Sequence, residues 1–117
     1  MNKKKTIIMV RVNEYTSRDL NKNIPFTPDE IAETARECEK AGASIIHFHA
    51  RKSNGDPSHD PEVYLEIVSK IRERSSLIVD STLGQITVKN TKERTSHIRK
   101  MKDQPMKRAD MAALDVG

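Results

Sequence analysis

Four short apolar segments recur along the chain at a nearly constant interval, and this repetition constrains the fold more than any other feature. They begin near residues 6, 44, 77 and 110, so each unit is about 35 residues long. Stretches with helical periodicity lie between them. Strands that alternate with amphipathic helices are typical of parallel sheets with right-handed crossovers, so the sequence predicts an α/β fold.

The helical stretches carry recognisable start signals. Residues 27–30 read Thr-Pro-Asp-Glu, a capping box in which Thr27 is the N-cap. The stripe that follows contains Cys38, which we expect to pack inside rather than to act as a nucleophile. A second helix begins at Asp60, and a weak, basic helix is predicted between 91 and 101.

The length of the chain accommodates only part of the fold that this repeat would build. Eight units of this size make a (β/α)8 barrel of roughly 250 residues. The 117 residues therefore predict the N-terminal portion of a TIM barrel, about four parallel strands with three helices, and 1–117 is expected to be an incomplete domain. An open parallel sheet leaves an edge and apolar surface uncovered, so we expect a homo-oligomer, a complementary half-barrel as partner, or marginal stability.

The second apolar segment, residues 45–51, contains two histidines one residue apart. In a strand His47 and His49 share a face, roughly 7 Å apart, while Ile46 and Phe48 take the other. Buried imidazoles need polar partners. A metal ion would supply one, and neighbouring backbone carbonyls are the alternative.

Polar residues gather just after each predicted strand. In TIM-barrel enzymes the active site lies at the C-terminal ends of the strands. The concentration of polar residues there favours a metal site at the two histidines. The residues in question are Glu14, His47, His49, Arg51, Ser81, Thr82 and Asp115.

Several segments are similar to those of the β-keto acid cleavage enzymes, and the similarity runs from about Thr6 to Gly117. The matching segments are 27–31, 41–51, 55–58, 71–74, 81–84 and 111–115. The resemblance implies a zinc-dependent enzyme on a TIM barrel. Such an enzyme condenses a β-keto acid with acetyl-CoA and releases acetoacetate and a new acyl-CoA.

Carried over by position, the resemblance implies that His47 and His49 bind zinc. It also implies that Glu14 contacts the variable end of the substrate and that Ser81 binds substrate. The family's threonine on strand four falls at Ala113 here. The third zinc ligand, a glutamate, and the activating arginine and aspartate come from late strands that this chain lacks. We therefore assign no catalytic residue within the chain.

Other residues carry alternative readings. Thr82 and Arg51 are also candidates for substrate contact. A cap or turn role is the alternative for Ser81 and Thr82, and a carboxylate pair at the rim is the alternative for Arg51.

A third donor to the metal would have to come from Asp80, Asp115, Glu14 or His59. Because the family's serine faces the lumen, alternation along the strand turns Asp80 away, which makes Asp115 the preferred stand-in. His59 is expected to be a solvated loop residue, and His97 is expected at the surface.

Composition bears on the location of the protein and on whether it binds nucleic acid. The lone Cys38, with no apolar leader and no membrane-length apolar run, predicts a cytoplasmic protein. Eight Lys or Arg lie between 83 and 108, but without interleaved aromatics or a known motif for nucleic acid. Two alternatives to the enzyme remain open, an inactive remnant with residual metal binding and a basic module associated with nucleic acid.

Overall fold

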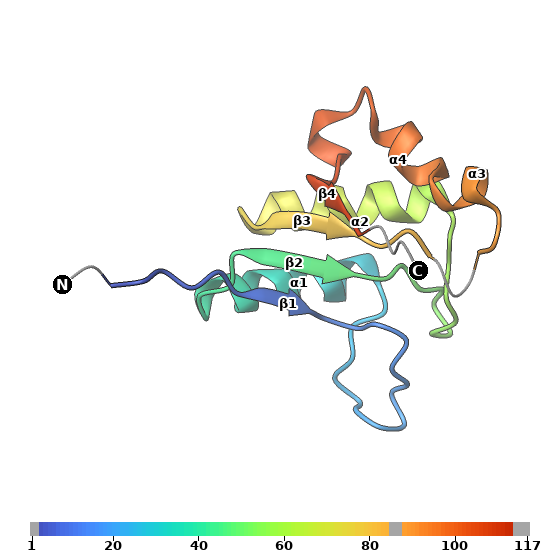
Figure 1. Cartoon of the computed structure of the whole chain (residues 1–117). Coiled ribbons are helices and arrows are strands. Elements are labelled where there is room, and N and C mark those ends of the chain that lie inside the picture. Colours follow the sequence, from blue (N-terminus) through green and yellow to red (C-terminus); the bar gives the residue numbers. More distant parts are fainter. Residues whose placement is uncertain (1–2, 85–87, 114–117) are drawn as a thin grey trace.

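The computed structural model describes residues 3–84 and 88–113 and contains a four-stranded parallel sheet. The strands are β1 (Met9–Arg11), β2 (Ile45–Phe48), β3 (Ile78–Ser81) and β4 (Met111–Ala112), ordered β1-β2-β3-β4. Figure 1 shows the strands side by side with their connecting helices. The α/β architecture and its parallel sheet are confirmed, and they are consistent with the N-terminal part of a TIM barrel. Part of the predicted fourth strand, including Asp115, lies outside the described residues.

The two long helices begin where the sequence predicts. α1 (Pro28–Lys40) starts at Thr27, whose hydroxyl accepts a hydrogen bond from the backbone of Glu30, and the Glu30 carboxylate accepts one from the Thr27 amide. α2 (Pro61–Arg74) starts at Asp60, whose carboxylate accepts from Glu62. Gly42 follows α1 with φ of +103°, a conformation that glycine adopts without strain.

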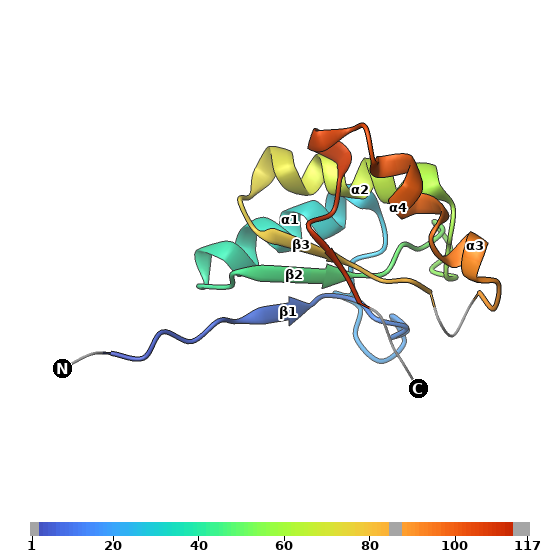
Figure 2. The same ribbon diagram turned by 45° about the horizontal axis from the view of Figure 1, so that its top comes forward.

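The third helical stretch differs from the expectation. It is divided into α3 (Thr91–Arg94) and α4 (Ser96–Met101), and a 3-10 helix, η1 (Pro105–Lys107), follows. Figure 2 shows α4 lying alongside α2. The prediction that His97 is at the surface is wrong, because α4 turns this side chain toward α2 and buries it completely.

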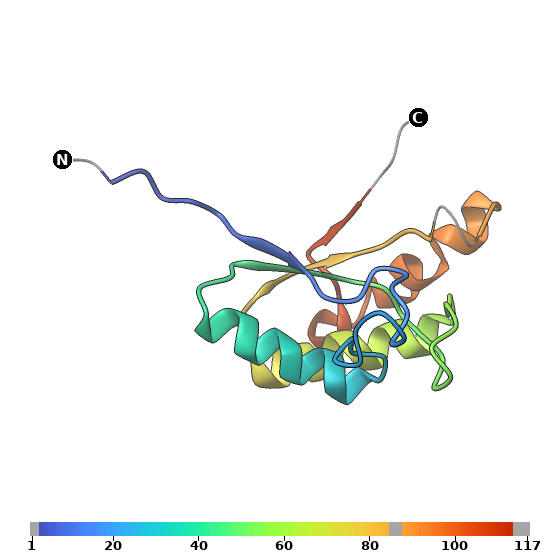
Figure 3. The same ribbon diagram turned by 90° about the horizontal axis from the view of Figure 1, so that it is seen from below.

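The core lies between the sheet and the helices, which cover one face of it. Figure 3 shows α1 and α2 on that side. The face of α2 toward the sheet is buried, through Tyr64, Leu65, Ile67, Val68 and Ile71. Cys38 on α1 is half-buried, and desolvation raises the pKa of its thiol, which agrees with a packing role.

The opposite face of the sheet is uncovered in the part of the chain that the structure describes. Met9, Ile78 and Met111 each remain 40 to 45% exposed, although all three belong to strands. The paired registers place Met9 beside Ile45 and Ile45 beside Ile78, so these apolar side chains form one row. Parallel sheets are ordinarily covered on both faces, so this surface calls for a covering element.

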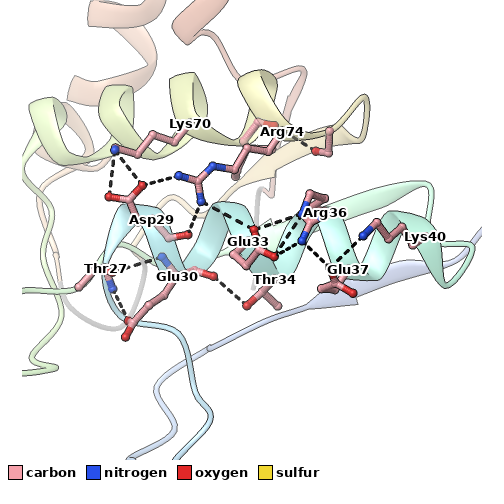
Figure 4. Close-up of polar contacts among 12 residues, drawn as sticks. Thr27, Asp29, Glu30, Glu33, Thr34, Arg36, Glu37, Lys40, Lys70 and Arg74 are labelled. Atoms are coloured by element: carbon pink, nitrogen blue, oxygen red, sulfur yellow. Dashed lines mark hydrogen bonds and ion pairs between the residues drawn. The ribbon is translucent and has the colours of Figure 1, made fainter.

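The outer surfaces of α1 and α2 are joined by ion pairs (Figure 4). Asp29 accepts hydrogen bonds from Lys70 and Arg74, and Arg36 pairs with Glu33 along α1. The hydrogen bond from Lys70, chiefly, lowers the pKa of Asp29. Because these groups are exposed, the pairs orient the two helices more than they stabilise them.

Candidate metal centre

His47 and His49 converge on one point at the carboxyl end of β2. Their ring centroids are 5.1 Å apart and their Nε2 atoms are 3.1 Å apart. Both side chains are buried, whereas Ile46 and Phe48 point into the helix layer and join the core. The alternation expected for a strand therefore holds, and the two imidazoles share the face opposite the helices.

Asp80 meets His47 from the neighbouring strand. The register pairs the two residues, and Oδ2 of Asp80 lies 2.9 Å from Nδ1 of His47. The expectation that Asp80 turns away is therefore wrong. It assumed the facing of Ser81 in the family, whereas here Ser81 pairs with Phe48 in the row that faces the helices. A shift of one residue moves every side chain of a strand to the other face.

Glu14 supplies a third polar atom, just beyond the end of β1. Its Oε2 lies 3.1 Å from Nε2 of His49, and its Oε1 lies 3.3 Å from a guanidinium nitrogen of Arg11. Glu14 has φ of +38°, the one non-glycine residue with positive φ among those described. Backbone strain of this kind persists where the surroundings enforce it and is common at binding sites.

The three side chains fit a metal ion. The ligating atoms of Glu14, His47 and His49 all lie within 4.8 Å of one another. Because the Asp80 carboxylate accepts a hydrogen bond from Nδ1–H of His47, the lone pair of that ring is on Nε2, which faces His49. Desolvation, chiefly, lowers the pKa of His49 to about 4, so this ring is neutral at pH 7. Two imidazole nitrogens and a carboxylate are a donor set that suits Zn2+.

Two buried residues that the sequence did not single out, or assigned differently, hold this arrangement in place. Asn13 accepts a hydrogen bond from the His49 amide and donates to the His49 carbonyl, so its side chain extends the pairing of β1 with β2. Arg51 donates to backbone carbonyls of Asn13, Glu14, Thr16 and Gly55. Backbone carbonyls take the place of the carboxylate that was the alternative partner, and the guanidinium fixes the backbone that carries Glu14. Contact of Arg51 with substrate stays a prediction.

Ser81 and Thr82 follow β3 and are both buried. The Ser81 hydroxyl lies 3.0 Å from Nε2 of His97 on α4, and Thr82 Oγ1 accepts a hydrogen bond from the Gly84 amide. Thr82 therefore has the turn role that the sequence left open. Contact of Ser81 or Thr82 with substrate stays a prediction.

The remaining candidates for a third ligand lie apart from this cluster. His59 is half-buried rather than solvated, and its Nε2 donates to carbonyls of Glu93 and Arg94. Asp115 lies outside the described residues. Among the residues described, Glu14 is thus the donor that joins the two histidines.

The model of the β-keto acid cleavage enzyme family matches residues 5–117. With its parallel α/β sheet and its candidate metal site at the strand ends, the chain belongs to the β-keto acid cleavage enzyme family.

Individual relatives agree with this assignment. A 3-keto-5-aminohexanoate cleavage enzyme of Fusobacterium nucleatum is 39% identical over 72 residues, which are 60% of this chain and 26% of the relative. The enzyme of the same name from Acetoanaerobium sticklandii is 31% identical over 103 residues, 86% of this chain and 35% of the relative. A 3,5-dioxohexanoate:acetyl-CoA acetone transferase of Paraburkholderia graminis is 37% identical over 62 residues, 52% of this chain and 20% of the relative. The chain thus matches about a third or less of the length of these relatives.

Proposed function

We propose that this chain forms the first metal-binding portion of a zinc-dependent enzyme that cleaves a β-keto acid with acetyl-CoA, releasing acetoacetate and an acyl-CoA. The observation that carries the proposal is the convergence of Glu14, His47 and His49, with Asp80 on the outer side of His47. The names of the relatives, among them three acetyl-CoA transferases, support the reaction class.

In this proposal Nε2 of His47, Nε2 of His49 and a carboxylate oxygen of Glu14 hold Zn2+. When bound, the ion supplies Lewis acidity that polarises the ketone of a β-keto acid. Asp80 keeps the proton of His47 on Nδ1, so that Nε2 stays available as a donor. The neutral imidazole of His49 brings no charge of its own that would repel a dication.

A hollow beside the metal centre offers space for substrate. It has a volume of about 530 Å³ and is lined in part by Tyr15, Arg18, Phe26 and Arg51. Tyr15 connects the two places, because its ring contacts His49 edge-on with centroids 4.6 Å apart. Arg18 lies over the Phe26 ring, where its guanidinium also pairs with Glu30. The lining contains Asp19 and Asp56 as well as the two arginines, so the hollow carries charges of both signs.

The uncovered face of the sheet supports a proposal about partners. Met9, Ile78 and Met111 would be covered either by a second copy of this chain or by a complementary half-barrel. The described residues contain no helix long and apolar enough to cross a bilayer. A cytoplasmic location remains our proposal, resting on the single cysteine.

The first alternative to an active enzyme is an inactive remnant that binds a metal ion without turnover. The site geometry fits it equally well, since the three donors can hold an ion whether or not turnover follows. The basic module for nucleic acid gains nothing from the structure. Several of its cations are engaged within the fold, such as Arg94 with the Leu83 carbonyl and Lys100 with Glu62.

One pair of measurements tests the proposal. Zinc binding by the full chain is measured by competition with a chromophoric chelator, and acetoacetate release is measured with β-keto acids, acetyl-CoA and Zn2+. We expect zinc binding that His47→Ala and His49→Ala abolish, with His59→Ala as the control. Binding without acetoacetate release supports the remnant, and an absence of zinc binding refutes the metal centre.

A further inference from the structure

His97 is a buried histidine for which the metal centre has no direct use. Its side chain is fully buried between α4 and α2, where its ring stacks on Tyr64 with centroids 4.2 Å apart and planes inclined by 28°. The ring of His59 meets it edge-on at 5.0 Å. Nε2 of His97 forms a 3.0 Å hydrogen bond with the Ser81 hydroxyl.

The surroundings determine which nitrogen of His97 carries the proton. Nδ1 is buried and has no hydrogen-bond partner. A proton on Nδ1 would therefore leave an unpaired N–H in the interior, which folded proteins rarely tolerate. The Thr82 carbonyl, which only accepts, also lies near the ring, and the Ser81 hydroxyl lies 3.3 Å from that oxygen. The proton consequently belongs on Nε2, which donates to Ser81.

The ring is also held in its neutral form. Burial, chiefly, lowers the pKa of His97 to about 4, and His59 acts in the same direction. At pH 7 the imidazole is thus a fixed, uncharged donor. The Ser81 oxygen accepts from it.

The hydrogen bond between His97 and Ser81 lies one residue along β3 from Asp80, which contacts the metal centre. Ser81 and Asp80 are consecutive residues of β3 and project to opposite faces of the sheet. Ser81 is tied to α4, while Asp80 is tied to Nδ1 of His47. Rotation of the strand about its own axis would have to break both contacts, so the Ser81 contact helps to fix the direction of the Asp80 carboxylate.

We propose that His97 is a positioning residue for the metal centre, acting as an Nε2–H donor that locks Ser81 and thereby holds Asp80 against His47. The inference rests on the proposed metal-binding function and adds a residue to it. It assigns a role to a histidine that touches none of the three ligands.

The first experiment needs no metal. Imidazole 15N–1H correlation spectra of the apo chain are expected to show His97 as the neutral Nε2–H tautomer and His47 as the Nδ1–H tautomer. In His97→Phe, which keeps an aromatic ring on Tyr64, the His47 Nδ1–H signal should broaden or shift as its bond to Asp80 loosens. In His97→Gln the amide reaches about as far as Nε2, and the His47 signal should stay near its original position.

The second experiment measures zinc affinity of the same variants. We expect His97→Phe to weaken zinc binding several-fold, less than the roughly 10- to 100-fold typical when a direct partner of a ligand is lost. His97→Gln should bind within about twofold of the original chain, since it restores the donor. The matched control is His59→Phe, from the same aromatic cluster, whose hydrogen bonds go only to carbonyls of α3 and which should leave affinity unchanged.

The outcomes separate this inference from the proposed function. An Nδ1–H tautomer at His97, or an unchanged His47 signal in His97→Phe, overturns the inference whether or not zinc binds. A chain that binds no zinc but shows the expected tautomers and the His47 shift refutes the metal centre and keeps the positioning contact. Should His97→Phe fail to fold, Ser81→Ala removes the same hydrogen bond and is read by the same His47 signal.

Discussion

The carboxylate of Asp80 lies 2.9 Å from Nδ1 of His47, across the pairing of β3 with β2. A carboxylate in this position fixes the tautomer and orientation of a metal-binding imidazole and raises its basicity. The contact is buried on both sides, at 5% and 7% side-chain exposure. It gives His47 a defined donor direction before any ion arrives.

Asp80→Ala is therefore expected to lower zinc affinity by roughly 10- to 100-fold. Asp80→Asn retains an acceptor for the Nδ1 proton without the charge. Its zinc affinity should fall between those of Asp80→Ala and the original chain. Competition with a chromophoric chelator measures both, and Asp103→Asn, an exposed change of the same charge, serves as control. Equal affinity in Asp80→Ala and the original chain would contradict the role given to this residue.

Glu14 combines a strained backbone with a donor atom, and one substitution separates the two properties. Glu14→Gly should raise the free energy of unfolding by about 1 kcal/mol, because glycine adopts φ of +38° without cost. The same variant should bind zinc far more weakly, since the carboxylate is gone. Glu14→Gln is the control, with weakened binding but no gain in stability. Chemical denaturation and chelator competition together report the two effects.

Arg51 donates hydrogen bonds to carbonyls of the loops that follow β1 and β2, and so stabilises the carboxyl end of these two strands. A lysine cannot donate in so many directions at once, so Arg51→Lys should lower the free energy of unfolding by about 3 kcal/mol. Arg36→Lys, which alters only exposed ion pairs on α1, should change it by about 0.5 kcal/mol or less. Urea denaturation of the apo chain compares the two, and similar losses in both variants would argue against the role of Arg51.

Stability should depend on pH through His97. The folded state lowers the pKa of this group from 6.5 to about 4, so the unfolded chain binds more protons between these values. The contribution of His97 to the free energy of unfolding is thus complete above pH 6.5. It is lost as pH falls toward 4, by at most about 3 kcal/mol. The titratable neighbours in contact with it are His59 and Tyr64. The difference in unfolding free energy between the original chain and His97→Gln, followed from pH 7.5 to about 4, isolates this effect from that of His49.

The uncovered face of the sheet should drive association. We expect size exclusion with light scattering to give a mass above the 13.3 kDa of one chain, and Ile78→Asp to shift it toward the monomer. Leu20→Asp, at an even more exposed apolar residue in the loop after β1, is the matched control and should not change the mass. If the original chain is a well-folded monomer with a sharp thermal transition, the proposal about partners is contradicted.

The local elements and the position of the histidine pair follow from the order of residues along the chain. The capping residues Thr27 and Asp60 act within a few residues along the chain, and alternation within one strand suffices to put His47 and His49 on the same face. Such features depend on backbone geometry between near neighbours, which is why the fold class and the histidine pair could be predicted.

The side chains from other strands that meet those histidines depend on how the strands and helices pack together. The facing of Asp80 depends on the register between β2 and β3, and the burial of His97 depends on how α4 packs against α2. Neither is set by local periodicity, since a single-residue shift in register exchanges the two faces of a strand. Contacts between residues 33 or 16 positions apart, such as His47 with Asp80 and Ser81 with His97, therefore appear only once the sheet is assembled.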